Sequence, residues 1–180
     1  LNARVGAAEA LLAAGATVDA AESYRGQTAL MLAAGEGNVD AVRALLAAGA
    51  KVAAQSKSGF TPLLFAVRNA QLETVRVLLE QGANVDDLAP DGTSALNVAI
   101  VNAFYEVASV LLDHGADPNL PDARASPLHT IAWLRIPGAT DRAAGVGELA
   151  TAAPRPLGNL TSLALARKLL GQGGSPNVRV

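Results

Sequence analysis

The sequence predicts an all-α fold in which helix–turn–helix repeats, joined by short β-turns, stack into a solenoid. Two sequence markers predict it, and both recur with a period of about 33 residues. The first is a Gly-x-Thr/Ser-Ala/Pro-Leu segment, which begins at Gly26, Gly59 and Gly92. The second is a Leu-Leu-x-x-Gly segment, which begins at Leu11, Leu45, Leu78, Leu111 and Leu169.

The first marker predicts the start of a short helix in each repeat. A hydroxyl residue precedes each apolar run and can cap the helix by accepting a backbone N–H. These residues are Thr28, Thr61, Ser94 and Ser126. In two repeats the next residue is a proline, Pro62 or Pro127, whose missing N–H costs nothing at that position.

The second marker predicts the end of a second helix. Apolar residues precede it at helical spacing, for example Val39, Val42 and Leu45. A glycine then follows where a left-handed residue ends a helix. These glycines are Gly15, Gly49, Gly82 and Gly115.

Together the markers resemble the ankyrin repeat family, whose pattern includes T-P-L-H-x-A, a glycine between the helices and G-A-D-x-N after the second helix. Ser126-Pro-Leu-His129 is similar to the first element, and Ala116-Asp-Pro-Asn119 to the last. Gly37 supplies the glycine between the helices in one repeat, whereas Ala70 and Ala103 replace it in the next two. The resemblance implies an ankyrin-type helix–turn–helix solenoid.

The period divides the chain into residues 1-23 (second helix only), 24-56, 57-89, 90-121 and 122-180. From Ser126 to Leu169 is 43 residues, against 17 from Thr28 to Leu45, so the last repeat carries 26 extra residues. This insertion, about 135-158, leaves a first helix ending near Leu134 and a second resuming near Asn159. A functional and a merely tolerated insertion are equally compatible with its length. Because no polar capping repeat is evident, we expect a monomeric array within a longer chain.

Composition excludes several classes of function. The chain has no cysteine, so disulfides, cysteine-bound zinc and iron–sulfur clusters are excluded. A net charge of -2 gives no basic field for nucleic acid, and no apolar run reaches the roughly 18 residues that membrane insertion needs. Arginine exceeds lysine 11 to 3, which indicates a bacterial coding bias. A cytoplasmic and a periplasmic or secreted location stay open.

Motifs that resemble catalytic or ligand sites have simpler interpretations. Gly145-Val-Gly-Glu-Leu-Ala150 matches a dinucleotide fingerprint but follows no predicted strand. His114, with nearby aspartates at 113, 117 and 122, lacks the spacing of metal ligands. The acidic residues Asp86, Asp87 and Asp91 fall in one turn, where aspartate is common for conformational reasons. We therefore predict no enzyme activity, no cofactor and no metal.

The resemblance implies instead a concave face, formed by the turn tips and the exposed side of each first helix, that binds a protein partner. The residues that the repeat register carries to that face are Tyr24, Arg25, Gln27, Glu36, Lys57, Ser58, Phe60, Arg68, Asn69, Asp91, Thr93, Asn102 and Trp133. The alternative for the aromatic residues Phe60 and Trp133 is that they fill gaps between neighbouring repeats.

Three hypotheses of function follow. The first is a non-enzymatic protein–protein interaction module. The second is a recognition arm of a larger enzyme or effector whose catalytic domain lies elsewhere. The third is a small-ligand site under the insertion, with Trp133 and Arg135 as its walls.

Overall fold

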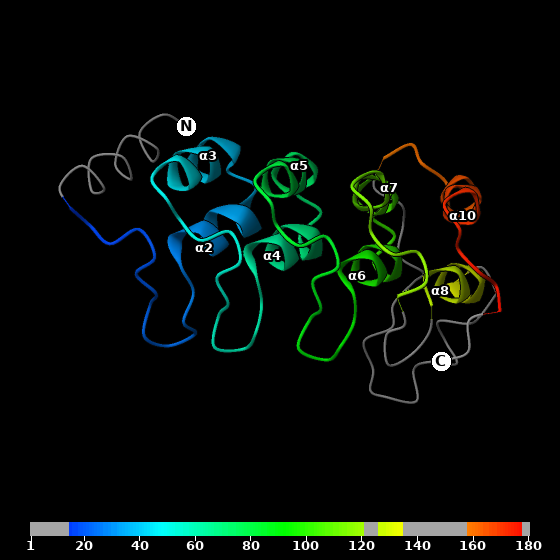
Figure 1. The fold of residues 1–180 in the computed structure, drawn as a ribbon, viewed down its shortest axis with the longest axis horizontal. Helices are drawn as coiled ribbons and strands as arrows, with labels where there is room; N and C mark the ends of the chain where they lie inside the picture. The colour runs from blue at the N-terminus through cyan, green and yellow to red at the C-terminus, as the bar shows by residue number, and fades with distance from the viewer. Residues whose placement is uncertain (1–14, 121–125, 135–157, 178–180) are drawn as a thin grey trace. The chain divides into compact units, whose positions relative to one another are not determined.

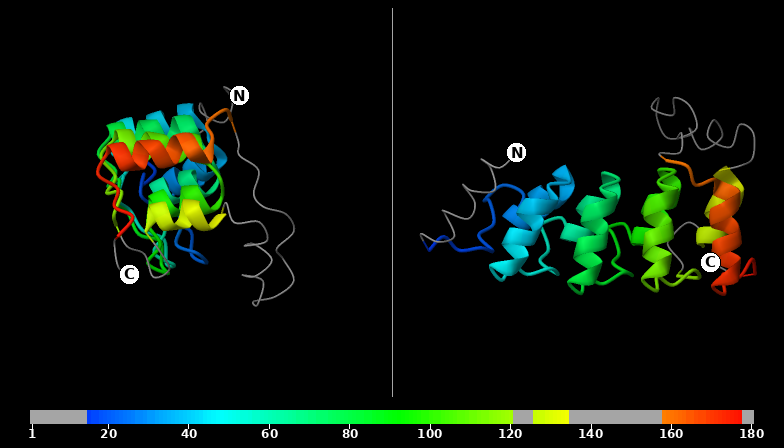
Figure 2. Two further views of the ribbon diagram at one scale, coloured as in Figure 1. Left: turned by 90° about the vertical axis from the view of Figure 1, so that its right-hand side faces the viewer. Right: turned by 90° about the horizontal axis from the view of Figure 1, so that it is seen from above.

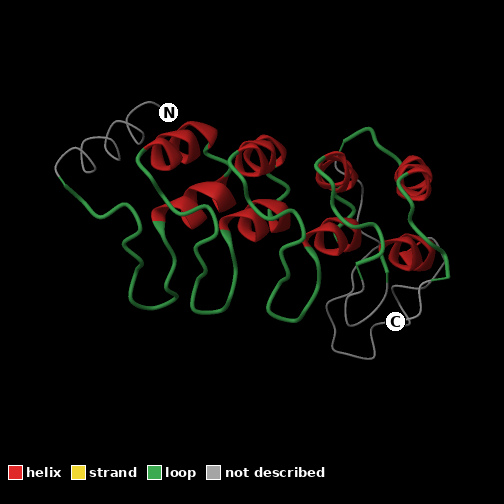
Figure 3. Cartoon of the chain, viewed as in Figure 1, coloured by secondary structure: helices red, strands yellow, loops and turns green. Residues whose placement is uncertain are grey.

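The computed structural model describes residues 15–120, 126–134 and 158–177. It divides into two compact units, Leu1–Asp91 and Gly92–Val180, each of which is treated by itself. The regular elements of the described residues are α-helices joined by loops, without strands (Figure 3). An isolated antiparallel bridge joins Ala21 to Thr28 within the first turn. The all-α fold class predicted from the sequence is confirmed.

The first unit contains two helix pairs in two layers. Helices α2 (Ala29–Glu36) and α3 (Val39–Ala47) form one pair, and α4 (Pro62–Arg68) and α5 (Leu72–Glu80) form the next. In Figure 1 α2 and α4 lie side by side in one layer, and α3 and α5 in the other. The turns that precede α2 and α4 project from the first-helix layer. This arrangement places those turns and the exposed sides of α2 and α4 together.

The second unit repeats this arrangement with α6 (Ala95–Val101), α7 (Tyr105–Asp113), α8 (Pro127–Leu134) and α10 (Ser162–Gly171). Helix α6 packs against α7 and α8, and α10 packs against α7 and α8 (Figure 2). Helix α10 begins three residues later than the expected position near Asn159. The reason is local, because the Thr161 hydroxyl caps the helix by accepting the N–H of Ala164 at 3.2 Å.

The predicted caps at Thr28, Thr61 and Ser94 and the predicted helix-ending glycines have clear structural counterparts, whereas, among the residues that the structure describes, no cap bond to the backbone is seen for Ser126. The hydroxyls of Thr28, Thr61 and Ser94 each accept the backbone N–H three residues ahead, at 3.4, 3.3 and 3.2 Å. The hydroxyl of Ser126 lies 2.6 Å from Nδ1 of His129. The glycines predicted to end the second helices have φ between +83° and +89°. Short-range chemistry therefore sets where α2, α4 and α6 begin, whereas α5 and α7 begin at Gln71 and Phe104 without a side-chain cap.

Burial follows the Leu-Leu pairs. The first leucine of each described pair is buried, with at most 4% of its surface exposed. These leucines are Leu45, Leu78, Leu111 and Leu169. The second leucine varies much more, since Leu112 is 2% exposed whereas Leu170 is 51% exposed. The two leucines of a pair thus have different roles in packing.

Two alanines adopt a backbone conformation that favours glycine. Ala70 and Ala103 lie between the two helices of their repeats with φ of 56° and 57°, where Gly37 has φ of 71°. A left-handed conformation costs an L-residue with a Cβ roughly 1–2 kcal/mol. Ala70 is half-buried, whereas Ala103 is fully buried. The same backbone strain therefore occurs in two different environments.

We expect Ala70→Gly to raise the free energy of unfolding by about 0.5–1 kcal/mol, because relief of the strain exceeds the extra flexibility of the unfolded chain. Ala103→Gly is the matched variant, and its gain should be close to zero because it also removes a buried methyl group worth about 0.8 kcal/mol. Urea unfolding followed by circular dichroism measures both. An equal gain at the two positions would contradict this assignment of burial.

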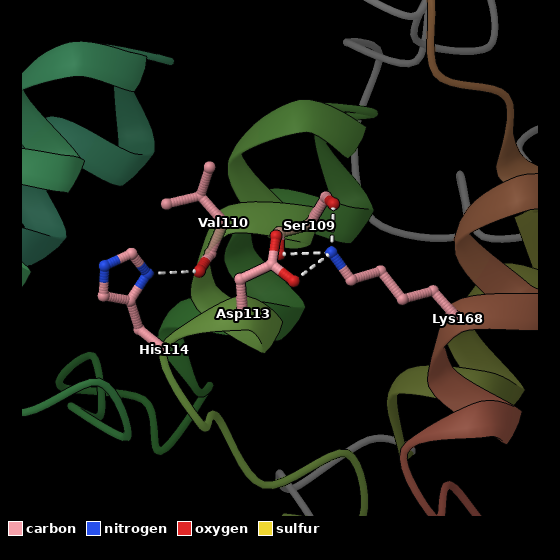
Figure 4. Close-up of polar contacts among 5 residues, drawn as sticks. All are labelled: Ser109, Val110, Asp113, His114 and Lys168. Atoms are coloured by element: carbon pink, nitrogen blue, oxygen red, sulfur yellow. Dashed lines mark hydrogen bonds and ion pairs between the residues drawn. The ribbon is translucent and has the colours of Figure 1, made fainter.

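Helix α10 is joined to α7 by a cluster of polar contacts (Figure 4). The ammonium group of Lys168 donates to the backbone carbonyl and the hydroxyl of Ser109, at 3.0 and 2.6 Å. It also lies 2.6 Å from the Asp113 carboxylate. At the other end of α7, the Glu106 carboxylate accepts the N–H of Leu160 at 2.7 Å. These contacts position the chain where it rejoins the array after the insertion.

We expect Lys168→Ala to lower the free energy of unfolding of the second unit by about 1–2 kcal/mol, because one change removes an ion pair and two hydrogen bonds. Trp133 is the chain's only tryptophan, so its fluorescence during urea unfolding reports on this unit. Arg76→Ala, on α5 of the first unit, is the control, and its urea unfolding is followed by circular dichroism. Its 3.6 Å pair with Glu73 is exposed, and such pairs contribute less than about 1 kcal/mol. Equal losses would argue against the anchoring role of Lys168.

Candidate functional site

The turn before α2 is held by its own hydrogen bonds. The Glu22 carboxylate accepts three backbone N–H groups of the turn, from Tyr24, Arg25 and Gln27, at 2.7, 2.5 and 3.2 Å. The backbone of Glu22 also bonds to Gln27 and Gly26. Tyr24 nevertheless exposes 82% of its surface. The turn therefore presents a large aromatic side chain from a fixed backbone.

The acidity of Glu22 reflects these contacts. Desolvation alone would raise the pKa of Glu22, but the backbone N–H groups of Gln27, Tyr24 and Arg25, together with the charge of Lys57, outweigh it. The pKa of Glu22 is consequently lowered from its ordinary value of 4.5. The stability that the charged Glu22 carboxylate gives the turn is present in full above pH 4.5. It is lost as the pH falls through the lower pKa that Glu22 has in the folded protein.

We expect acidification to loosen this turn only below pH 4.5, the ordinary pKa of Glu22. Amide resonances of Tyr24, Arg25 and Gln27 should then shift together, because all three N–H groups lose the same charged acceptor. An NMR pH titration of the wild type and of Glu22→Gln measures this effect. The variant should lack the shared transition, whereas a wild-type midpoint above the ordinary value would contradict the expectation.

Lys57 joins this turn to the next one. Its backbone N–H donates to the carbonyl of Arg25 at 2.9 Å, and its ammonium group donates to the carbonyl of Ser23 at 2.5 Å. A Cβ on Gly26 would press against the Lys57 side chain, so the two turns approach closely at a position with φ of 67°. Lys57 was predicted from the sequence as a partner contact, and here it also fixes the spacing of the turns.

Phe60 is the centre of a second group on the same unit. Its ring lies 5.7 Å from that of Phe65, with the ring planes tilted by 50°. The guanidinium carbon of Arg68 lies 5.7 Å from the Phe60 ring centre. In the first turn the guanidinium of Arg25 lies over the Tyr24 ring at 5.8 Å. The aromatic residue of each turn thus lies beside an exposed arginine, Arg25 in the same turn and Arg68 at the end of α4.

The remaining predicted residues of the first unit have mixed environments. The Asn69 amide donates to the carbonyl of Gly35 at 3.0 Å, so it braces α4 against α2. The Ser58 hydroxyl lies 3.2 Å from that of Ser56. Glu36 and Asp91 are exposed, and Gln27 is half-buried. Asn69 therefore has a packing role in addition to any role in binding.

In the second unit, Asn102 and Trp133 lie on packed helices. Asn102 caps the end of α6, and its amide donates to the carbonyl of Val98 at 2.8 Å. Trp133, in the last turn of α8, is 43% exposed, and Val101 at the end of α6 is 41% exposed. Thr93 is half-buried in the turn before α6. This unit therefore also exposes apolar surface on its first-helix layer.

Two residues on the first-helix layer of the first unit, Leu32 and Phe65, were not predicted from the sequence. Leu32 on α2 is 48% exposed, and Phe65 on α4 contacts Phe60. Both follow the capping threonine of their helix by four residues. The sequence could have indicated them, because both repeats have an apolar residue four positions after the capping threonine. The family pattern used for the prediction takes only the seventh and eighth positions after the capping residue from each first helix.

The residues that were considered for a metal site have other partners in the structure. The Nδ1 atom of His114 lies 2.8 Å from the Val110 carbonyl, and Asp113 pairs with Lys168 (Figure 4). The Asp117 carboxylate accepts the N–H of Asn119 at 2.8 Å. Across the residues that the structure describes, no three metal-binding side chains form a possible ion site. Asp122, Arg135 and the Gly145–Ala150 motif lie outside the described residues.

A shallow hollow lies between α3 and α5, in the second-helix layer of the first unit. Its volume is about 190 Å³, and it is lined by Arg43, Leu46, Ala47, Val77 and Gln81. Pockets for small ligands usually enclose roughly 300–1,000 Å³. The hollow is therefore a poor candidate for a substrate site. Among the described helices, none has the length and apolar character needed to span a bilayer.

Comparison with known families and structures agrees with this geometry. The family model for ankyrin repeats, which describes three copies, matches residues 2–89 and 49–122. The chain belongs to the ankyrin repeat family. Repeats of this family generally act as protein–protein interaction modules and are typically not catalytic.

A solved ankyrin repeat domain from Acinetobacter baumannii AYE has a similar structure. It is 27% identical in sequence, with a TM-score of 0.72, and the match covers 94% of this chain and 76% of that domain. This ankyrin likeness supports the helix–turn–helix solenoid predicted from the repeats. No curated protein matches the chain. The bacterial source of the similar domain agrees with the coding bias seen in the composition.

Proposed function

We propose that this ankyrin chain is a non-enzymatic interaction module that binds a protein partner on the concave face formed by its turn tips and first helices. The observation that carries the proposal is the first turn. Its backbone is fixed by Glu22 and Lys57, while Tyr24 exposes 82% of its surface. A rigid aromatic anchor loses little conformational entropy on binding, and tyrosine, tryptophan and arginine predominate among binding hot spots.

Each unit contributes a further aromatic position. Phe60 with Arg68 extends the proposed surface on the first unit, and Trp133 is an exposed aromatic residue on the first-helix layer of the second unit, described by itself. Lys57 and Asn69 support this surface through contacts between neighbouring repeats. In this proposal the exposed aromatic and arginine side chains contact the partner. Lys57 and Asn69 hold neighbouring repeats at a fixed spacing.

Site-specific photo-crosslinking tests the proposed face. A photoreactive phenylalanine replaces Tyr24 in the full chain, and the matched control carries it in place of Arg43, an exposed residue of α3 in the other layer. A specific partner should crosslink from position 24 and be displaced by excess unlabelled wild type, but not by excess Tyr24→Ala. Crosslinking of the same partner from position 43 alone would contradict the proposal.

A further inference from the structure

Two exposed arginines on the first unit are stacked on aromatic rings. Arg25 lies over Tyr24 and Arg68 over Phe60, with guanidinium-to-ring distances of 5.8 and 5.7 Å. A guanidinium that rests one face on a ring keeps the N–H donors at its edge available for a bidentate carboxylate. The stacking also restricts the side chain before binding, which reduces the entropy lost when a salt bridge forms.

The charges around these pairs are unevenly arranged. Lys57 adds a third cation beside the first pair, because its backbone N–H bonds to the Arg25 carbonyl and its ammonium group to the Ser23 carbonyl. Two acidic residues belong to the first turn and to the helix α2 that follows it. One of them, Glu22, directs its carboxylate at the N–H groups of its own turn. The other, Glu36, is the last residue of α2. Arg25, Lys57 and Arg68 thus accompany the two rings with three positive charges. The acidic residues Asp86, Asp87 and Asp91 belong to the next turn along the chain, where Asp87 accepts the Thr61 hydroxyl at 2.6 Å.

We infer that this surface takes an acidic peptide segment of the partner. Carboxylates of that segment bind the edges of Arg25 and Arg68, and its apolar side chains pack against Tyr24 and Phe60. The inference rests on the proposed function and deepens it by assigning the partner's chemistry. Apolar rings beside the cations suit a peptide with mixed side chains better than a polyphosphate backbone, whose binding depends on a broad basic field.

The inference is tested by titrating the labelled full chain with a short synthetic peptide that represents a linear segment of the partner. The peptide carries glutamate at every second position, two leucines, and serine elsewhere. Its matched control has glutamine in place of each glutamate, and a single-stranded oligonucleotide serves as a different polyanion. NMR shifts of the backbone amides and arginine side chains locate binding, and the affinity is measured at low and at physiological salt.

The glutamate peptide should shift the resonances of residues 22–27, 56–60 and 68 and should bind more weakly as salt rises. Arg25→Gln and Arg68→Gln should each weaken binding about tenfold. Arg25→Lys should restore part of the loss, since it keeps the charge but not the planar fork. Arg43→Gln, which removes an exposed arginine from α3, should leave the affinity unchanged.

Each contrary outcome identifies which proposal has failed. Equal binding of the glutamine peptide at the same residues would overturn the acidic partner and leave the interaction face in place. Tighter binding of the oligonucleotide would overturn it in favour of a phosphate ligand. If neither peptide binds while crosslinking from position 24 still captures a specific partner, the inference is wrong and the proposed function stands. If that crosslinking fails as well, both are wrong.

Discussion

Replacement of Leu169 with alanine is expected to lower the free energy of unfolding of the second unit by about 2–5 kcal/mol. Leu169 is fully buried, and its helix, α10, packs against α7 and α8. Truncation of such a side chain removes its favourable transfer from water and leaves a cavity. Urea unfolding followed by Trp133 fluorescence measures the loss, because Trp133 lies on α8 in the same unit.

The adjacent leucine provides the control. Leu170 is 51% exposed, so Leu170→Ala should change the free energy of unfolding by less than about 1 kcal/mol. Leu112, the corresponding residue in the preceding repeat, is 2% exposed, and Leu112→Ala should behave like Leu169→Ala. Similar losses for Leu169→Ala and Leu170→Ala would mean that Leu170 is covered in solution.

The second large effect is on binding. With a partner identified by crosslinking, we expect its affinity for the chain to fall by about 2 kcal/mol or more in each of three variants, as is typical of aromatic anchors. The variants are Tyr24→Ala, Phe60→Ala and Trp133→Ala. Tyr24→Ala should leave the free energy of unfolding nearly unchanged because the side chain is 82% exposed. Phe60→Ala should cost some stability too, since Phe60 packs against Phe65 and Arg68. Calorimetric titration and urea unfolding monitored by circular dichroism on the same variants separate the two effects.

Leu170→Ala is again the matched control, because it removes a comparably exposed apolar side chain from the second-helix layer. Its affinity for the partner should match the wild type. If Leu170→Ala weakens binding as much as Trp133→Ala, exposed apolar surface in general binds the partner and the assigned face is wrong. If Phe60→Ala and Trp133→Ala lower stability without weakening binding by the folded protein, both residues belong to the core.

The sequence by itself was sufficient to predict the repeated helix pairs and the capping residues and glycines at several of their ends. Thr61 caps α4 with Pro62 in the first turn, and Gly82 follows α5 with φ of 83°. These features depend on hydrogen bonds and dihedral angles within a few residues, so they can be predicted without knowledge of distant contacts. The start of α10 at Ser162 was mislocated because a long insertion removes the repeat register that places the other helices.

The candidate surface was less predictable. Its residues were carried over by register, and register alone does not distinguish a side chain that meets a partner from one that meets the next repeat. Lys57 and Asn69 bond to carbonyls 34 residues earlier in the chain, at Ser23 and Gly35. Phe65 joins Phe60 only because the folded turn brings the two rings together.

The Leu-Leu pairs show most directly what the sequence determined and what only the tertiary structure decided. Periodicity determined that each pair in the described residues lies near the end of a second helix, because apolar spacing and the following glycine act locally. It could not show that Leu112 is buried while Leu170 is exposed. The exposure of a side chain depends on which other elements lie against it, and that is a property of the packed structure. Burial in turn sets the cost of removing the side chain.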